Sequence, residues 1–311
     1  MKNKKIKVAV VQASPVLFDL EASLAKVERL VKEASEAGAG LVLFPEAYLS
    51  VYPRGLGFGT VVGSRDPKGR EDWLLYYQHT ITVPGPAADY LGEIAQKFKV
   101  WLVIGVTERS QSGGTLYCTL LYYSPTGKLV QKHRKLKPTA AERIIWGEGD
   151  GSDLQVVQTP FGKIGGLICW ENYMPLARMN LYQQGVEIYL APTADERDSW
   201  IASMQHIACE GRCYVLSCNQ MVLKSDYPAR FQEELAHQKE IMSRGGSMIV
   251  SPLGEILAGP LFDKEGVLYA QLDRKEVIKS KLDFDAVGHY RRSDVFNFNW
   301  KQGTFSSNND V

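Results

Sequence analysis

The regular succession of short apolar runs, separated by turn residues and amphipathic segments, most constrains the fold of this chain. Lys7–Gln12 is a β-branched run of strand length, and Leu20–Ala37 repeats apolar residues with a helical period up to Gly38. The next apolar run, Leu41–Phe44, again has the length of a buried strand. The chain therefore opens with a β-α-β arrangement, and these runs are too short to cross a membrane.

The rest of the chain continues this alternation but interrupts it with hairpins. We predict helices over Ala87–Phe98, Leu176–Gln184 and Trp200–Gly211, strands over Trp101–Val106, Ile188–Ala191, Tyr214–Cys218 and Val267–Leu272, and hairpins at Leu116–Tyr123/Leu129–His133, Leu154–Gln158/Lys163–Cys169 and Gly246–Ser251/Glu255–Leu257. Because hairpins pair antiparallel strands, the sheets are expected to be mixed. No linker rich in Pro, Gly or Ser divides the chain, so we predict one α/β domain over residues 1–301, with two layers of sheet covered by helices. The polar residues 302–311 are expected to form a flexible tail.

Composition limits the classes of partner. The 311 residues include 36 Lys and Arg against 35 Asp and Glu, which gives a net charge of +1. Without a basic excess, neither nucleic acid nor an anionic membrane is expected as the main partner. Hydrophobic residues make up 45% and charged residues 23% of the chain, as in a folded globular protein rather than a disordered or multi-pass membrane protein.

The cysteines favour a reducing compartment. They are five in number and their spacing matches no disulfide framework: Cys118, Cys169, Cys209, Cys213 and Cys218. The basic start Met1–Lys5 is followed only by the short apolar run Val8–Val11, far below the length of a signal or membrane segment. We therefore expect a cytoplasmic protein.

Several common cofactor and hydrolase motifs are missing from the sequence. The glycine-rich stretches Gly55–Gly59 and Gly147–Gly151 lack the G-x-G-x-x-G spacing of dinucleotide sites, and no P-loop occurs. His206, Cys209 and Cys213 have helical spacing, but no fourth ligand accompanies them, so packing explains them better than metal binding. Gly211 is expected to end that helix before Cys213, and neither G-x-S-x-G nor H-E-x-x-H occurs. We expect no metal and no cofactor.

Three segments place reactive side chains at the ends of predicted strands, where layered α/β folds bind their ligands. Glu46 follows the apolar strand 41–44, and Cys169 ends a later strand, where a thiol can serve as a nucleophile. Lys135 lies on the opposite face of its strand from Arg134, with Glu142 seven residues further on. Taken singly, each residue has a simpler explanation. Glu46 fits a solvated loop, Lys135 a solvated edge strand, and Cys169 an ordinary buried cysteine.

Taken together and in order, the motifs around these residues change that interpretation. They are Phe44-Pro45-Glu46, His133-Arg134-Lys135-Leu136 with Pro138-Thr139 and Glu142-Arg143, Cys169-Trp170-Glu171-Asn172-Tyr173-Met174-Pro175, Ala191-Pro192-Thr193, Glu210-Gly211-Arg212 and Gly288-His289-Tyr290. From Val8 to about Phe296, the chain resembles the nitrilase branch of the carbon–nitrogen hydrolase superfamily.

This resemblance implies a catalytic triad, a fold and an assembly. The implied triad has Glu46 as general base, Lys135 as the stabilising cation and Cys169 as nucleophile, and a second family glutamate falls on Glu142. The implied fold is a four-layer αββα sandwich that pairs as a dimer, and many nitrilases assemble further into helical filaments. The sequence departs from the family pattern at Ser293, where a proline is common, and at Ala140-Ala141, where bulkier side chains are common. These departures leave the chemistry intact and bear on the pocket width and the oligomer contacts.

The implied reaction converts an organic nitrile and two waters into a carboxylic acid and ammonia. Because a thiol of ordinary pKa is mostly protonated at neutral pH, Glu46 is expected to take its proton as Cys169 attacks. The reaction passes through a thioimidate and then a thioester, and Lys135 and the backbone N–H of Trp170 are expected to stabilise the developing charge. Glu142 could orient the substrate, hold Lys135 or steer the split between acid and amide.

The substrate pocket is predicted from aromatic residues close in sequence to the triad. Tyr52, Trp146 and Trp170 suggest a hydrophobic pocket, although each is equally explained as an ordinary core aromatic. Thr193, which ends the motif Ala191-Pro192-Thr193, is also assigned to substrate binding.

Three alternatives follow from the same residues. The nearest is an amidase or N-carbamoyl hydrolase that uses the same triad on a C–N single bond. A catalytically silent protein that retained the fold is a second, although no triad residue is missing. Cys–His proteolysis is a third, and it is disfavoured because the sequence offers no oriented partner for His133 or His206.

Overall fold

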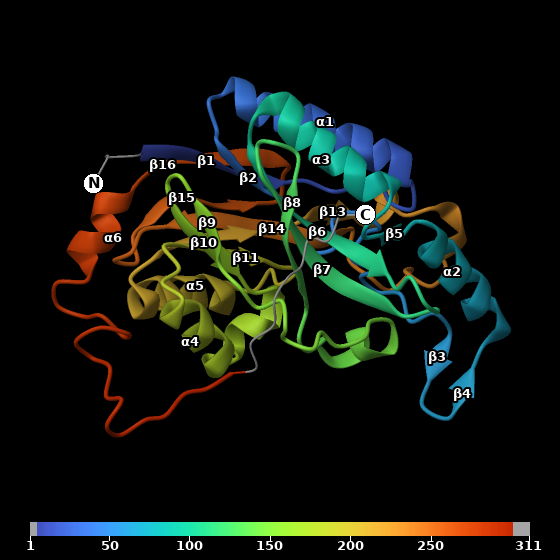
Figure 1. Ribbon diagram of the computed structural model, residues 1–311. Helices are drawn as coiled ribbons and strands as arrows, with labels where there is room; N and C mark the ends of the chain where they lie inside the picture. Colours follow the sequence, from blue (N-terminus) through green and yellow to red (C-terminus); the bar gives the residue numbers. More distant parts are fainter. Residues whose placement is uncertain (1–4, 301–311) are drawn as a thin grey trace.

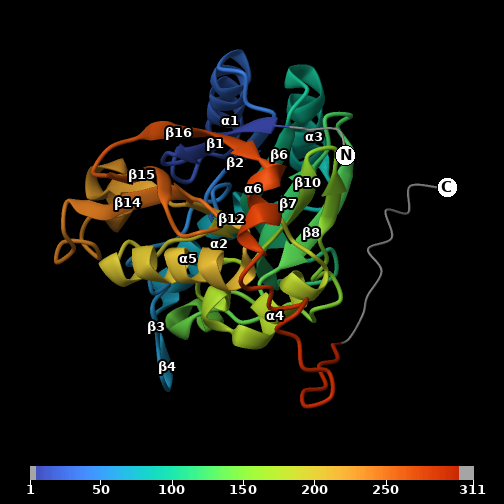
Figure 2. The ribbon, with the colours of Figure 1, turned by 90° about the vertical axis from the view of Figure 1, so that its left-hand side faces the viewer.

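Two β-sheets lie face to face between two layers of helices (Figure 1). The computed structural model describes residues 5–300, so the predicted tail over residues 302–311 lies outside the described residues. Turning the molecule by a quarter-turn keeps the same order of layers, with α1 and α3 above the sheets and α4 and α5 below them (Figure 2). This arrangement confirms the predicted four-layer αββα sandwich.

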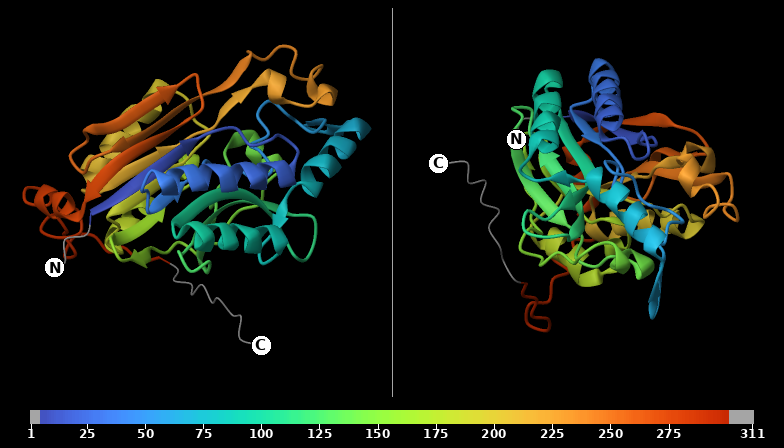
Figure 3. Two further views of the ribbon diagram at one scale, coloured as in Figure 1. Left: turned by 90° about the horizontal axis from the view of Figure 1, so that it is seen from above. Right: turned by 90° about the vertical axis from the view of Figure 1, so that its right-hand side faces the viewer.

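The first sheet has the strand order β16-β1-β2-β6-β7-β8, and β5 pairs with β6. Its strands are β1 (Lys5–Gln12), β2 (Leu41–Leu43), β5 (Ile81–Thr82), β6 (Trp101–Arg109), β7 (Leu116–Tyr123), β8 (Leu129–Arg134) and β16 (Gly266–Asp273). The pairs β1–β2 and β2–β6 are parallel, whereas β1–β16, β6–β7 and β7–β8 are antiparallel. Helices α1 (Leu20–Glu36) and α3 (Pro86–Phe98) lie side by side across its outer face (Figure 3).

The second sheet has the order β13-β14-β12-β11-β10-β9, with β15 paired to β14. Its strands are β9 (Val157–Thr159), β10 (Gly162–Gly166), β11 (Ile188–Pro192), β12 (Tyr214–Cys218), β13 (Met221–Leu223), β14 (Ile241–Val250) and β15 (Ile256–Phe262). The pairs β10–β11 and β11–β12 are parallel and the others antiparallel, so both sheets are mixed, as predicted. Helices α4 (Pro175–Gln183) and α5 (Asp198–Gly211) cover its outer face, and α6 (Arg274–Ser280) follows β16.

Three apolar layers hold the sandwich together. Alternate residues of each strand face opposite sides of a sheet, so Val8 and Val10 of β1 enter the core between the sheets while Ala9 and Val11 enter the core under α1 and α3. A third core lies between the second sheet and helices α4 and α5. Helix α1 contributes the predicted apolar face, and Asp19 caps its first turn by accepting a hydrogen bond from the N–H of Ala22.

The structure also contains elements that the apolar pattern did not predict. They are the two-stranded β3 (Thr60–Val61) and β4 (Ser64–Arg65), which project from the body (Figure 3), helix α2 (Pro67–Gln78), and the short elements β5, β13 and α6. Helix α2 was missed because its buried positions are Gly69, Asp72 and Tyr76, which form no apolar stripe. The predicted strand 163–169 was too long, since β10 stops at Gly166 and a 3₁₀ helix, η2 (Cys169–Tyr173), begins at Cys169.

Within residues 5–300, no helix is both long enough and apolar enough to cross a lipid bilayer. The one helix that suggested a metal site, α5, ends at Gly211 as predicted, which leaves buried Cys213 beyond its end and His206 exposed on its surface. The described part of the chain holds no cluster of three or more His, Cys, Asp or Glu side chains suited to a metal ion.

Candidate active site

The structure brings Glu46, Lys135, Glu142 and Cys169 into one buried site between the two sheets. Glu46 follows β2 and Lys135 follows β8, both in the first sheet, whereas Cys169 follows β10 of the second sheet. Glu142 lies in a short 3₁₀ helix, η1 (Ala140–Ile144), after β8. The site thus requires both sheets, and neither could form it alone.

Two glycines let the backbone approach closely enough to form this site. A Cβ atom at Gly105 of β6 would lie 2.3 Å from the carbonyl oxygen of Pro45, next to Glu46. A Cβ atom at Gly166 of β10 would lie 2.1 Å from the carbonyl oxygen of Leu190. Since real Cβ atoms do not approach that closely, only glycine fits at these two positions.

Lys135 joins the two carboxylates. Its Nζ donates to Oε1 of Glu46 at 2.6 Å and to Oε2 of Glu142 at 2.7 Å. Lys135 and Glu46 are fully buried, and Glu142 is 7% exposed. The thiol of Cys118 donates a weaker bond to the same Glu46 oxygen, with Sγ and Oε1 3.6 Å apart. Oε2 of Glu46 has no hydrogen-bond partner among residues 5–300, so one buried carboxylate oxygen is left free to accept a proton.

Cys169 occupies an unusual backbone conformation. Its φ of +52° lies in the left-handed region, which a residue with a side chain adopts only where its surroundings hold it there. The Asn172 amide holds this turn by donating to the carbonyl oxygens of Cys169 at 2.7 Å and Leu167 at 2.9 Å. On the sulfur itself, Oγ1 of Thr193 donates to Sγ at 3.2 Å.

Burial controls the protonation of the three groups. Burial raises the pKa of the Cys169 thiol above its usual value, and the Glu46 carboxylate raises it further. Burial also raises the pKa of the Glu46 carboxyl, although the Lys135 ammonium opposes this shift. For Lys135, burial alone would lower the pKa, but the Glu46 and Glu142 carboxylates raise it well above its usual value. At neutral pH the thiol therefore keeps its proton, and it becomes a nucleophile only when a base removes that proton.

Glu142 is fixed from three sides. Besides Lys135, its Oε2 accepts from the N–H of Thr139 at 2.7 Å, and its Oε1 accepts from the hydroxyl of Tyr52 at 2.7 Å. Of the roles left open for Glu142 by the sequence, these contacts favour that of holding Lys135.

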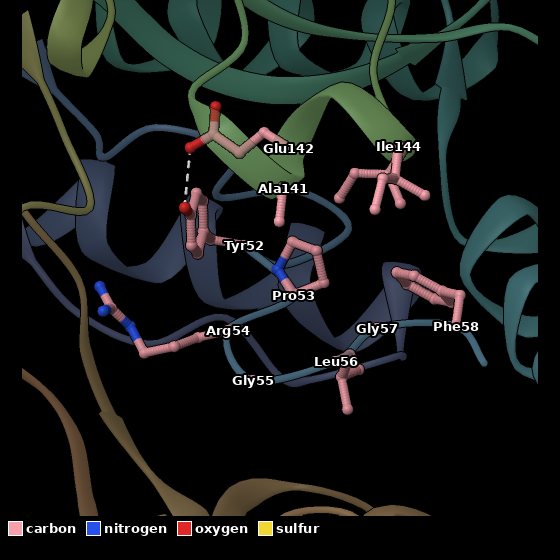
Figure 4. Close-up of a pocket in the computed structure, with 11 residues that line it drawn as sticks. Tyr52, Pro53, Arg54, Gly55, Leu56, Gly57, Phe58, Ala141, Glu142 and Ile144 are labelled. Carbon is pink, nitrogen blue, oxygen red and sulfur yellow. Dashed lines mark hydrogen bonds between the residues drawn. The ribbon is translucent and has the colours of Figure 1, made fainter. Parts of the chain in front are cut away.

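A cavity of about 350 Å³ opens above Cys169. Its lining includes Tyr52, Arg54, Thr139, Glu142, Cys169, Trp170, Ala194, Asp195, Glu196 and Arg197. A second cavity of about 200 Å³ shares Tyr52, Arg54 and Glu142 with the first and is otherwise mainly apolar, with Leu56 and Phe58 facing Ala141 and Ile144 (Figure 4). The pocket was expected to be hydrophobic, but the space beside the sulfur is bordered by two arginines and three carboxylates because the loop after β11 supplies Asp195, Glu196 and Arg197.

The four residues predicted to bind substrate fall into two groups. Tyr52 and Trp170 border the cavity above Cys169. Trp146 is buried behind it, with its ring 5.7 Å from that of Tyr52 and 5.8 Å from Nζ of Lys135. Thr193 is likewise fully buried and reaches the Cys169 sulfur rather than the cavity. Sequence proximity did not separate the residues that line the cavity from those that support it.

The expectation that His133 lacks an oriented partner was wrong. Its Nδ1 lies 2.9 Å from Oδ1 of Asp153, and its Nε2 lies 3.2 and 3.1 Å from the two carboxylate oxygens of Glu171. Burial alone would lower the pKa of His133, but Glu171 and Asp153 raise it to about 10. Asp153 lies in the loop before β9, where no sequence motif pointed to it.

His133 makes the stability of the fold depend on pH. Its pKa is 6.5 when unperturbed and about 10 in the folded protein, so the bound proton stabilises the fold fully below pH 6.5. As pH rises from 6.5 towards 10, the unfolded state has lost this proton while the folded state still binds it, and the stabilisation declines. We expect His133→Gln to lower the free energy of unfolding most at pH 6.5 and least at pH 10, measured by urea denaturation. A loss that is the same at both pH values would contradict a charged His133.

Comparisons with known proteins identify the family and support the fold. Residues 7–282 match the family described as carbon–nitrogen hydrolase. The chain is 51% identical over 296 residues to the bifunctional nitrilase/nitrile hydratase NIT4A of Lupinus angustifolius, a match that covers 93% of this chain and 84% of that protein. It is 48% identical over 293 residues to the aliphatic nitrilase of Sinorhizobium fredii (strain HH103), covering 94% of each. Among solved structures, a carbon–nitrogen hydrolase from Helicobacter pylori G27 superposes with a TM-score of 0.74 at 21% identity, over 94% of this chain and 97% of that one, which supports the fold.

Proposed function

Since the chain belongs to the carbon–nitrogen hydrolase family, as its motifs predicted, we propose that it is a nitrilase that converts organic nitriles to carboxylic acids and ammonia. The observation that carries this proposal is a buried thiol, that of Cys169, in one site with the Glu46 carboxylate. Oε2 of Glu46 has no hydrogen-bond partner among the described residues, and Oε1 accepts from the Lys135 ammonium. Identities of 48% and 51% to proteins named as nitrilases, over most of both chains, support nitriles as the substrate class.

The first half of the reaction forms a covalent adduct. Glu46 takes the thiol proton through its free oxygen as Sγ of Cys169 bonds to the nitrile carbon. One bond of the triple bond breaks, and its electron pair moves to nitrogen. Lys135 and the backbone N–H of Trp170 stabilise that negative charge, and the proton held by Glu46 passes to nitrogen to give a neutral thioimidate.

Two waters complete the turnover. The first, activated by Glu46, adds to the thioimidate carbon and gives a tetrahedral species that carries the sulfur, a hydroxyl and an amino group. Loss of ammonia from this species leaves a thioester, and the second water releases the acid and restores the thiol. If the same species instead expels the sulfur, the product is the amide. The relative named above as a bifunctional nitrilase/nitrile hydratase supports measuring this branch, and we expect Glu142 to influence it through its hydrogen bond with Lys135.

The substrate enters the cavity above Cys169, with Tyr52 and Trp170 against its organic group. Trp146 and Thr193 act indirectly, since Trp146 packs behind Tyr52 and Thr193 holds the sulfur. The neighbouring apolar cavity beside Ala141 gives a longer organic group a place to extend.

The expected assembly and location are also part of this proposal. Exposed apolar side chains at Tyr173, Met174 and Leu176, where η2 meets α4, support pairing of two copies through this face. A helical filament and a cytoplasmic location stay predictions from the resemblance and from the cysteine content.

Release of ammonia, acid and amide from a panel of nitriles tests the function. We expect benzonitrile, phenylacetonitrile, a dinitrile or a short aliphatic nitrile to yield ammonia with the acid as main product. Each nitrile is run beside its matching amide and a carbamoyl compound. Hydrolysis of the amides or carbamoyl compounds with no turnover of any nitrile would instead support an amidase or N-carbamoyl hydrolase.

A further inference from the structure

Glu171, two residues after the proposed nucleophile, connects the two segments that carry Lys135 and Cys169. Its Oε1 accepts from the N–H of Leu136 at 2.6 Å, and its Oε2 accepts from the N–H of Ile168 at 2.6 Å. Leu136 directly follows Lys135, and Ile168 directly precedes Cys169. One buried carboxylate therefore ties the end of β8 in the first sheet to the turn after β10 in the second.

His133 and Asp153 complete this connection. The Glu171 side chain is only 1% exposed, and burying a carboxylate costs free energy unless it is paired. His133 provides the positive charge, with its Nε2 3.2 Å from Oε1 and 3.1 Å from Oε2 of Glu171. Asp153 holds the other ring nitrogen of His133, and its second oxygen accepts from the N–H of Arg134 at 2.9 Å. Every oxygen of the two carboxylates thus has a partner, and the His133 ring is fixed at both nitrogens.

We propose that Glu171, supported by His133 and Asp153, is a positioning residue that sets the distance and orientation of Cys169 relative to Lys135 and Glu46. This inference rests on the proposed function in one respect, because its turnover assay uses a nitrile as substrate. Among residues 5–300, the carboxylate of Glu171 bonds to His133 and to the N–H groups of Leu136 and Ile168, and not to Glu46, Lys135 or the Cys169 sulfur, so Glu171 acts through the two peptide groups it binds. The left-handed backbone at Cys169 makes such a restraint necessary, because an unrestrained cysteine relaxes out of that conformation.

The opposite face of β8 provides a matched control. There Lys132 and Arg134 of β8 pair with Glu108 of β6, which is also 1% exposed and accepts from Lys132 at 2.8 Å and from Arg134 at 2.7 and 2.9 Å. Side chains alternate along β8, so this cluster faces away from His133 and Lys135. Glu108→Gln therefore disturbs a buried ionic cluster on β8 without touching the peptides beside Cys169.

The test compares Glu171→Gln with Glu108→Gln in the full chain. A glutamine at 171 keeps the size of the side chain but presents an NH₂ group to one of two N–H donors, so it holds only one segment. We expect kcat for the best nitrile to fall on the order of 10- to 100-fold in Glu171→Gln, with KM within about threefold, because small misplacements of reacting groups cost rates of this size. We expect Glu108→Gln to keep kcat within about threefold of the wild-type value, even if its Tm falls as far as that of Glu171→Gln.

Alkylation of Cys169 by iodoacetamide, followed by mass spectrometry of its peptide, gives a readout that needs no nitrile. Partly exposed Cys209 serves as the internal reference. If alkylation of Cys169 is slower in Glu171→Gln but not in Glu108→Gln, the positioning role of Glu171 is supported even if no nitrile is turned over. Equal effects of the two variants on kcat and alkylation, or no effect of Glu171→Gln, would overturn this positioning role but would not contradict nitrile hydrolysis. If Glu171→Gln does not fold, His133→Gln takes its place, since it keeps both backbone N–H groups that donate to Glu171 but removes the balancing charge. The same comparison with Glu108→Gln applies.

Discussion

Cys169→Ala is expected to release no ammonia from any nitrile that the wild-type protein hydrolyses. The sulfur forms the only covalent link to the substrate in the proposed reaction, and without it neither the thioimidate nor the thioester can form. Loss of turnover by a factor on the order of 10⁴ or more is expected, measured as ammonia and acid against time. The fold should be retained, because alanine fills the same small buried site and removes one weak hydrogen bond from Thr193.

A second cysteine supplies the control for this substitution. Cys209, which is partly exposed on α5 and lines neither cavity of the candidate site, can be changed to alanine with little expected effect on turnover. Cys118 is unsuitable as a control because its thiol touches Glu46. Ammonia release from Cys169→Ala above a few per cent of wild type, in protein with a wild-type near-UV circular dichroism spectrum, would remove Cys169 from the reaction.

Lys135→Met is expected to lower kcat/KM on the order of 10²-fold or more. The substitution removes the cation that stabilises charge on the nitrile nitrogen and leaves Glu46 and Glu142 buried without their shared partner. Two unpaired carboxylates in one buried site repel each other, so the pKa of Glu46 should rise further and the acid limb of the pH–rate profile should move to higher pH. A stability loss of about 3–5 kcal/mol is expected as well, because a buried charge is left uncompensated.

Lys137→Met provides the comparison, because Lys137 lies two residues after Lys135 but is exposed and pairs with exposed Glu148. It should change neither kcat/KM nor the pH profile, since exposed ion pairs contribute little. The pH–rate profiles of both variants are measured with the nitrile that gives the highest wild-type rate. Near-wild-type activity in Lys135→Met would contradict the proposed triad.

The layered fold could be predicted from the sequence because its elements are long and periodic. The face of α1 from Leu24 to Val31 repeats with a helical period, and alternation along β1 and β8 assigns each side chain to one side of a sheet. Elements without such a pattern escaped prediction, as α2 shows: its buried residues include Gly69 and Asp72, and it is packed by tertiary contacts rather than by an apolar stripe.

The sequence by itself also determined the reactive groups and their order. Alternation along β8 predicts that Lys135 can face inward, and the motifs at three strand ends, through their resemblance to a known family, indicate Glu46, Lys135 and Cys169 as candidates. Local sequence suffices here because each of these side chains takes its direction from its own strand or turn.

Only the tertiary structure decided which distant groups meet around them. Asp153 reaches His133 and Glu171 joins two sheets, yet the residues in each contact lie 20 and 38 positions apart. Arg54 and Arg197 likewise come from separate loops to border the same cavity. Contacts of this kind depend on how two sheets stack and how loops close over their edge, and alternation within one strand carries no information about that packing.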